Sequence, residues 1–514
     1  MSLKRRENNE AMVEPLTFYV EGHPIFCKNC FDKQQDIGEK DQTMAYKRQE
    51  QYDIYFRLFQ EPLQKNHELI FLAERINWDD LTERLLPYYS RKGRRAKKIR
   101  MMAGLHILKH RFSLSDEDVV KGLHENVYWM AFCGVKLQAR YGSDGQGEVG
   151  VRPCSFLEPS TMTKFRRRLG AEGMRVLEDS IKGVLISEKQ ICPRTQVVDT
   201  TAQPKHIEYP TDTALLDRGR RRLLRTIKSL SAHGVEVAKG IRTFTRLGKK
   251  VMVEINKLGK DRAKRIETGL RKLSEYAQEV IKRVPRVVEE AQRKVKQLSK
   301  RGKQKQAHVI EQLKERLQGD TELLNRVIHQ AQERLRGVHV PGKIYSLHEP
   351  HVACIRKGKR AKPNEYGTKV LISVDRHGYV VDHREYASNP QDSELLDEAC
   401  QRWEQVFRAP AKELAADRGF HVNPRSKSRH LKKIPKVSIP TTGKKPHPAA
   451  KTFWFKRLQK QRAKIEPLIG HLKVDYGMER CRYKGFEGDQ INVSLASIAW
   501  NLRKWGKHLT AQAA

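Results

Sequence analysis

Three acidic residues stand out because of the segments that surround them. Asp199 and Asp417 each come at the end of a short hydrophobic stretch typical of a strand, and Glu466 falls within a predicted helix. No acidic residue lies between Asp417 and Glu466, while residues 418–465 contain 15 Lys and Arg. An acid kept in such basic surroundings indicates that the carboxylate itself is needed.

Carboxylates arranged in this way could hold a divalent metal ion. Mg²⁺ is bound in proteins by one or two carboxylates, with phosphate and water completing the shell. Two such ions can stabilise the attacking and leaving oxygens of an in-line phosphoryl displacement. We therefore expect Asp199, Asp417 and Glu466 to be catalytic and to bind Mg²⁺ or Mn²⁺, as a pair of ions. The competing interpretation is that each is a structural acid held in a salt bridge.

The segment around Glu466 has the spacing of one helix face. Arg462, Glu466 and Lys473 are separated by four and seven residues, so their side chains line up along a helix. Two phosphate-binding cations would then flank the catalytic acid, although a plain surface pair of Arg462 with Glu466 would show the same spacing. Because Pro467 would disrupt a helix interior, the helix either begins near Ile465 or kinks there.

The charge of the whole chain indicates a polyanionic partner. The 514 residues include 101 Lys and Arg against 61 Asp and Glu, a formal net charge of +40. Such an excess suits phosphate neutralisation with release of counterions, so we expect nucleic acid as the partner. Ribosomal and chromatin-type proteins share this charge, which therefore predicts a partner and no activity.

Other classes of protein are disfavoured by the sequence. There is no run of about 18 apolar residues for a membrane span, and no apolar segment follows the basic start as in a secretory signal. Eight scattered Cys are typical of a reducing cytoplasm, so we expect a cytoplasmic protein. His23, Cys27 and Cys30 could supply three zinc ligands, but the fourth is missing, and ordinary thiols are the alternative.

The chain divides into segments of different character. A polar extension (1–66) precedes a helical unit (67–138), in which apolar residues recur at helical spacing from Ile99 to Leu108. With the basic run at 91–98, this unit could be a helix-turn-helix-like DNA-binding domain, or a plain helical bundle with a solvated basic face.

An α/β catalytic core, a mixed sheet with flanking helices, is expected from two separate segments. Residues 155–214 begin it and contain Asp199, and residues 339–514 complete it with Asp417 and Glu466. Expected strands lie at 195–199, 369–375, 379–386 and 413–417, and expected helices at 392–407 and 489–507.

Between the two parts of the core we expect a helical insertion at 215–338. Apolar residues recur there at alternating intervals of four and three, over 266–280, 288–298 and 324–335, with charged flanks. Breaks are expected near Pro285 and around 301–305. A narrow apolar seam favours a helical hairpin or coiled coil, which would project from the core and contact DNA, a second protomer, or both.

The motifs around the three acids resemble those of the DDE insertion-sequence transposases, specifically the insertion-sequence-five family. The first motif is Val-Asp-Thr-Thr at 198–201, and the second is Ala-Asp-Arg-Gly at 416–419. The third combines Arg462, Glu466 and Lys473 and continues through Arg480 to Asn492. The resemblance covers most of 67–135 and 155–505, apart from the insertion.

The resemblance implies a ribonuclease H-like core and an enzyme that cleaves the ends of an insertion sequence and transfers the strand into target DNA with Mg²⁺. It implies terminal inverted repeats and target DNA as partners, and a homodimer or larger synaptic assembly. The residues that we expect to contact DNA are Arg462, Lys473, Arg418, Lys456 and Arg457.

The chain departs from the family pattern in two places. A related pattern has Tyr three residues before the Arg, where this chain has Gln459, and the insertion follows the first Asp, whereas some relatives expand after the second. Two alternatives to a transposase stay open: a non-catalytic DNA-binding or architectural protein, and a ribonuclease H-like nuclease without strand transfer.

Overall fold

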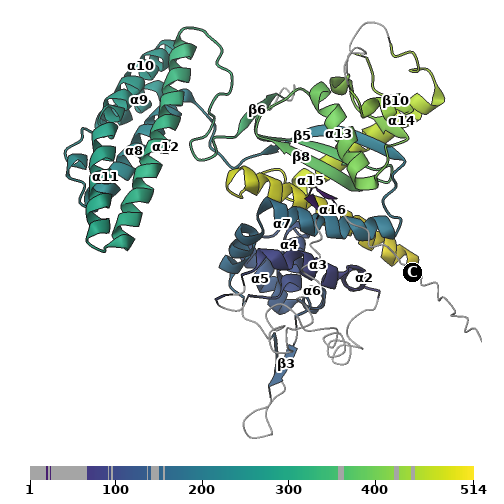
Figure 1. Ribbon diagram of the computed structural model, residues 1–514. Helices are drawn as coiled ribbons and strands as arrows, with labels where there is room; N and C mark the ends of the chain where they lie inside the picture. Colours follow the sequence, from purple (N-terminus) through teal and green to yellow (C-terminus); the bar gives the residue numbers. More distant parts are fainter. Residues whose placement is uncertain are drawn as a thin grey trace, which may run out of the picture.

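The structure of the protein is a computed structural model. It describes residues 19–20, 23–24, 66–90, 92–93, 96–135, 137–140, 150–153, 157–356, 364–421, 428–441 and 446–513. Figure 1 shows a sheet covered by helices on both faces, N-terminal helices packed against helices α7 (Pro159–Ser187) and α16 (Gly485–Ala513) of one face, and a separate group of long helices standing apart.

The sheet is mixed, as expected. Its strands are β5 (Thr195–Pro204), β6 (Ala353–Arg356), β7 (Asn364–Val374), β8 (Val380–Tyr386), β9 (Glu413–Ala415) and β10 (Lys436–Ser438). Their order is β10-β9-β5-β7-β6, with β8 also paired with β7. β9 is parallel to β5 and β10 is parallel to β9, whereas β6 and β8 are each antiparallel to β7, and β7 is antiparallel to β5.

Helices cover the two faces because successive strand residues point to opposite sides. Val198 and Leu371 belong to one hydrophobic core, and Val197 and Val370 to another. The first core is filled by α7 (Pro159–Ser187), α13 (Asp392–Phe407) and α16 (Gly485–Ala513), and the second by α14 (Phe453–Ala463), α15 (Ile465–Val474) and the other side of α16. α7 is interrupted at Gly170, where φ is 62°, so two helices meet there.

The N-terminal helices do not form a core of their own. They are α2 (Glu68–Arg75), α3 (Trp78–Leu85), η2 (Leu86–Tyr88), α4 (Ile99–Arg111), α5 (Asp116–Glu125) and α6 (Val127–Cys133). Their buried residues join the same core as α7 and α16. α4 is buried along most of its length, and Lys109 and Arg111 pair with Asp116 and Glu68. The choice between a DNA-binding unit and a plain helical bundle depended on the basic run at 91–98, so DNA binding by this unit stays a prediction.

The insertion is a bundle in place of the expected hairpin or coiled coil. It comprises α8 (Asp212–Ala232), η3 (Glu236–Ala238), α9 (Thr245–Asn256), α10 (Arg262–Ile281), α11 (Val284–Lys300) and α12 (Gln304–Leu335), which share one hydrophobic core. The breaks expected near Pro285 and at 301–305 are present, but α8 and α9 add a further layer. α8 packs on both α10 and α12, so the seams are closed within one chain (Figure 1).

The remaining described elements are short. β1 (Tyr19–Val20) pairs with β2 (His23–Pro24), β3 (Leu137–Arg140) pairs with β4 (Gly150–Pro153), and η4 (Arg418–Phe420) and η5 (Leu431–Lys433) are single turns. Cys27 and Cys30, the expected zinc ligands, lie outside the described residues, as does most of the 1–66 extension. None of the described helices is both long and apolar enough to cross a membrane.

Candidate active site

Asp199 lies on the central strand of the sheet. The expectation that it ends a strand is wrong, because β5 continues to Pro204 and pairs with β7 along that whole length. At the far end of this pairing, a Cβ on Gly367 would come within 2.0 Å of the carbonyl oxygen of Gln203, so only glycine allows the two backbones to approach. Asp199 is therefore held rigidly at mid-strand, with 8% of its surface exposed.

Asp417 is brought beside Asp199 by the register of two parallel strands. Val197 on β5 pairs with Ala415 on β9, so the two aspartates are each two residues beyond a paired position. Asp417 follows the end of β9 and caps the turn η4, where its carboxylate accepts a hydrogen bond from the backbone N–H of Gly419 at 2.9 Å. Strand pairing and this turn together fix the direction of the second carboxylate.

Glu466 is supplied by a helix that packs on the same sheet. α15 begins at Ile465, so Pro467 lies in its first turn. Of the two alternatives, a helix that begins near Ile465 is therefore correct, and a kink at Pro467 is not. Ile465 and Leu468 are buried against the sheet residues of the second core, which leaves the Glu466 side chain 61% exposed at the helix N-terminus.

One guanidinium lies among the three acids. Arg462 Nη1 is 2.9 Å from Glu466 Oε1, and Arg462 Nη2 is 3.5 Å from Asp199 Oδ2 and 4.0 Å from Asp417 Oδ2. The acids come from a central strand, a strand-end turn and a helix, and Arg462 comes from the end of α14. A surface pair of Arg462 with Glu466 alone would not include the two aspartates.

The donor atoms of this group suit a hard divalent cation, since all three acids present carboxylate oxygens. Among the described residues, no group of three or more His, Cys, Asp or Glu side chains is close enough to hold a metal ion as the side chains stand. The guanidinium of Arg462 provides the positive charge that the three carboxylates share. For the acids to close around a metal ion, this guanidinium has to move out from between them.

The other predicted DNA-binding cations fall into two groups. Lys473 Nζ lies 3.3 Å from Glu365 Oε2, and Arg457 pairs with Glu413. Burial raises the pKa of Glu413, but its hydrogen bonds with Thr195 and Arg457 outweigh this effect and lower the pKa overall. In contrast, Arg418 and Lys456 are exposed and form no ion pair within the described part of the chain.

Sequence reasoning missed Asp392, a further acid near the site. It is the first residue of α13, and its carboxylate accepts a hydrogen bond from Thr200 Oγ1 at 2.9 Å and pairs with Lys369 Nζ at 2.6 Å. Thr200 directly follows Asp199, so this contact braces the strand at the catalytic position. Only the pairing of β5 with β7 brings Lys369 and Thr200 together, and no sequence signal indicated it.

Gln459 occupies the position where related sequences have Tyr. Its amide Nε2 donates to the carbonyl oxygen of Ser438 at 2.8 Å and lies 3.3 Å from that of Ala416. Ala416 immediately precedes Asp417, so Gln459 ties α14 to the strand ends that carry the second acid. A tyrosine could donate only one such hydrogen bond.

Comparison with known proteins finds two transposase families that match parts of the chain. Residues 57–142 match the family described as Transposase domain (DUF772), and residues 421–505 match the Transposase DDE domain. The second match includes Arg462 and Glu466 and begins after Asp199 and Asp417.

A curated relative and the solved structures complete the comparison. Over 189 residues the chain is 36% identical to the uncharacterized protein ORF8 in the nfe locus of Rhizobium meliloti, a match that covers 36% of this chain and 82% of the relative. No solved structure matches the chain.

Proposed function

This chain belongs to the DDE insertion-sequence transposases, and we propose that it cleaves DNA at the ends of its own element and transfers the freed strand into target DNA. The proposal rests on one observation: carboxylates from two parallel strands and one helix surround a single guanidinium. We place the chain within the insertion-sequence-five family and regard the sheet and its helices as a ribonuclease H-like core.

In this proposal Asp199, Asp417 and Glu466 hold Mg²⁺ or Mn²⁺, most simply as two ions. When bound, the metal would stabilise negative charge on the phosphate and lower the pKa of an attacking water. Asp199 is set by the rigid central strand, while Glu466 lies on an exposed helix end and can adjust its position. One fixed and one adjustable carboxylate suit a site that must accept two different DNA substrates in turn.

Two displacements at phosphorus make up the reaction. Water first attacks the phosphodiester at the element end, which breaks the bond to the 3′ oxygen and releases a 3′ hydroxyl with its proton. That hydroxyl then attacks a target phosphodiester, a new phosphodiester forms, and the target strand leaves as its own 3′ hydroxyl. Arg462 would leave the carboxylates when metal binds and contact a DNA phosphate, with Arg418 and Lys456 as further phosphate contacts.

The partners follow from this reaction. We propose that the protein binds the terminal inverted repeats of its element and target DNA, and that a homodimer or larger assembly holds two ends together. It would act in the bacterial cytoplasm, in association with the nucleoid.

The test uses purified full-length protein, Mg²⁺ and a duplex that carries the element end. Asp199→Asn and Glu466→Gln should each reduce strand cleavage by roughly a thousand-fold, because metal-ion stabilisation contributes several kcal/mol. Binding to the same duplex should be retained. Glu83→Gln is the matched control, since Glu83 is exposed and forms no ion pair within the described residues.

Three outcomes would contradict the proposal in different ways. Full cleavage by Asp199→Asn would remove the assigned site. Binding without cleavage by the wild-type protein would favour the architectural alternative. Cleavage without joining to a target duplex would favour a nuclease of the same fold.

A further inference from the structure

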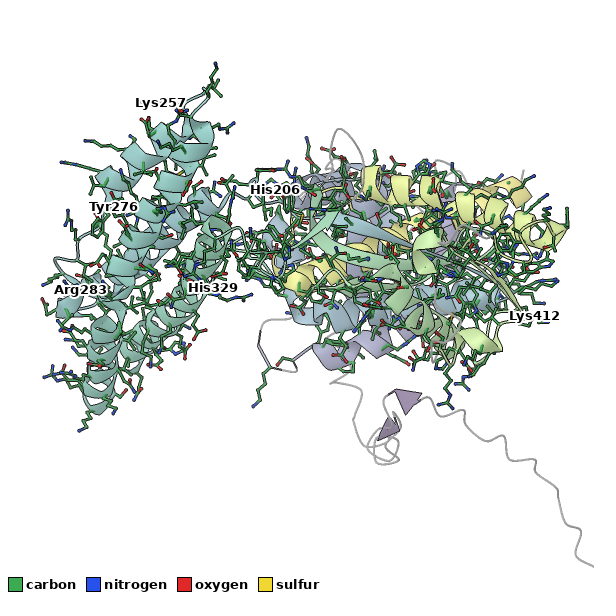
Figure 2. All side chains as sticks on the ribbon, turned by 90° about the horizontal axis from the view of Figure 1, so that it is seen from above. His206, Lys257, Tyr276, Arg283, His329 and Lys412 are labelled. Atoms are coloured by element: carbon green, nitrogen blue, oxygen red, sulfur yellow. The ribbon has the colours of Figure 1, made fainter. Side chains whose placement is uncertain are left out.

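A basic groove runs between the helical bundle and the sheet domain. It encloses about 1280 Å³ and is lined by α8, by the segments 238–245 and 345–349 of the bundle and its return connection, and by residues 480–484. Figure 2 shows His206, which also lines this cavity, on the side of the sheet domain that faces the bundle. We refer to this cavity as the bundle groove.

One wall of the bundle groove is an extended basic segment. Cys481 forms an isolated parallel bridge with Lys205, and its N–H donates to the carbonyl oxygen of Pro204 at 2.8 Å. Because alternate residues of an extended chain point to opposite sides, Cys481 is buried while Arg480, Arg482 and Lys484 are exposed. Neighbouring cations on this wall are therefore spaced at about 6.6 Å, two residues apart.

The opposite wall is one face of α8. Arg221, Arg225 and Lys228 follow one another at intervals of four and three residues, so they lie on the same side of the helix, and all three are exposed. Arg221 pairs with Asp217. Within the described part of the chain, Arg225 and Lys228 form no ion pair.

The acids that line the bundle groove do not neutralise these cations. Glu208 pairs with Arg218, and Glu349 Oε2 accepts a hydrogen bond from the N–H of Gly485 and lies 3.5 Å from Lys205 Nζ. Burial and the nearby Arg222 and Arg225 lower the pKa of His348, which also lines the groove. The field in the groove is therefore positive, and its unpaired cations need an anion from outside the chain.

The bundle groove connects with the catalytic helix. A neighbouring hollow of about 1100 Å³ shares Lys205, Arg480 and Arg482 with the groove and is also lined by Lys473, on the helix that carries Glu466. A polyanion lying along the 480–484 segment would therefore extend from the bundle toward the catalytic carboxylates.

We infer that the bundle groove binds the phosphodiester backbone of the element-end duplex, inward from the bond that is cleaved. That the bound duplex is an element end rests on the proposed function. That the groove binds a DNA backbone is argued separately, from its unpaired cations. In this arrangement the insertion is a DNA clamp, and the bundle and the 480–484 segment grip the same stretch of backbone.

The test measures DNA binding by the full-length protein at several salt concentrations. The groove variant combines Arg225→Ala, Lys228→Ala and Arg482→Ala. The matched control combines Arg283→Ala, Arg286→Ala and Lys296→Ala, three exposed bundle cations that do not line the groove; Figure 2 shows Arg283 on the side of the bundle away from the sheet domain. The probes are a long duplex that extends well inside the element and a short duplex that spans only the cleaved bond.

The groove variant should bind the long duplex about 10- to 100-fold more weakly, and its log–log salt slope should shrink by about 0.9 for each lost phosphate contact. Its binding to the short duplex should match that of wild type. The control variant should match wild type in its affinity for the long duplex and in its salt slope. Restoring charge with Arg225→Lys and Arg482→Lys should return most of the slope. An unchanged slope in the groove variant, or an equal loss in the control, would overturn the inference.

The proposed function fails separately. The Glu466→Gln protein should keep the wild-type salt slope while losing cleavage. If the wild-type protein does not cleave DNA but the groove variant still shows a smaller salt slope, the DNA-binding role of the groove is supported and the catalytic proposal is contradicted.

Discussion

Two arginines of the sheet domain, Arg462 and Arg457, contact carboxylates, whereas two exposed cations of the bundle groove, Arg225 and Lys228, form no ion pair within the described residues. Arg462 contacts Asp199, Asp417 and Glu466, and Arg457 pairs with Glu413. Arg225 and Lys228 have no such partner among the described residues. The Lys and Arg side chains behind the net charge of +40 therefore have two roles. Some pair with the acids of the candidate site, and others are available to contact DNA phosphates.

The two regions also differ in how they are stabilised. The bundle has its own hydrophobic core, while the N-terminal helices, the sheet and α16 share theirs. We therefore expect the bundle to unfold without disturbing the catalytic strands.

Beyond the carboxylate variants, the largest effect is expected from removing the shared guanidinium. Arg462→Ala should bind Mn²⁺ about tenfold more tightly in the absence of DNA, because the three carboxylates lose the cation that competes with metal. Strand cleavage should fall by about 100-fold, since a phosphate contact is lost. Titration with Mn²⁺ and a cleavage assay measure the two changes.

Arg457→Ala is the control on the same helix, because Arg457 pairs with Glu413 and does not contact the three acids. Weaker or unchanged Mn²⁺ binding by Arg462→Ala would show that the guanidinium does not occupy the place of the metal.

Separate cores predict separate responses to core mutations. Leu324 in the bundle and Leu495 on α16 are both fully buried, so replacing either with Ala should cost about 2–5 kcal/mol. In Leu324→Ala, amide exchange should speed up in α8 to α12 but not in β5 or β7. In Leu495→Ala the pattern should reverse. Equal loosening of both regions in either variant would contradict the separation.

Alkaline pH should weaken the sheet domain alone. Burial lowers the pKa of His383, but Glu178 and Glu385, at 2.8 Å and 2.5 Å, outweigh this and raise it to about 9. Because the pKa of His383 in the folded protein is above its ordinary value, the charged imidazole stabilises the fold. This stabilisation is complete below about pH 6.5 and is lost as the pH rises through 9. Arg175 Nη2 lies 3.0 Å from Glu385 Oε2, and burial lowers the pKa of the nearby Lys182, but Asp179 and Glu178 outweigh this and raise it.

The free energy of unfolding of the sheet domain should fall by an amount on the order of 2 kcal/mol. Urea unfolding of the wild-type protein, followed by a probe in the sheet, measures this change. His383→Gln should show a flatter pH dependence. The described histidines of the bundle, at 233, 308 and 329, are exposed, and bundle unfolding should change little over the same range. A parallel loss in the bundle would contradict this difference.

The smallest effect is expected at Gln459. Gln459→Ala removes hydrogen bonds to the carbonyl oxygens of Ser438 and Ala416, so it should cost about 1 kcal/mol and loosen the turn of Asp417. Cleavage should fall severalfold while Gln459→Glu, which cannot donate, gives no rescue. Unchanged cleavage by both variants would show that the strand ends hold Asp417 without this residue.

Local patterns in the sequence determined the elements. Apolar spacing predicted α13 at its observed bounds, β-branched runs predicted β7 and β8, and a short apolar run before Asp417 predicted β9, although β7 begins five residues earlier than expected. Pro285 and the polar stretch at 301–305 predicted two helix breaks because those signals act on the backbone where they occur. The basic surroundings of three acids indicated the candidate site, since charge content needs no fold to be recognised.

Tertiary structure alone decided what these elements contact. The apolar spacing in the insertion predicted that each helix buries a narrow face. It did not predict how many helices pack together, because periodicity identifies the buried face of a helix and not the element that packs on it. The extension of β5 beyond Asp199 depended on β7, which lies far along the chain. The position of Arg462 among all three acids likewise required the strand register and the packing of α15, and these long-range contacts leave no signal at any single residue.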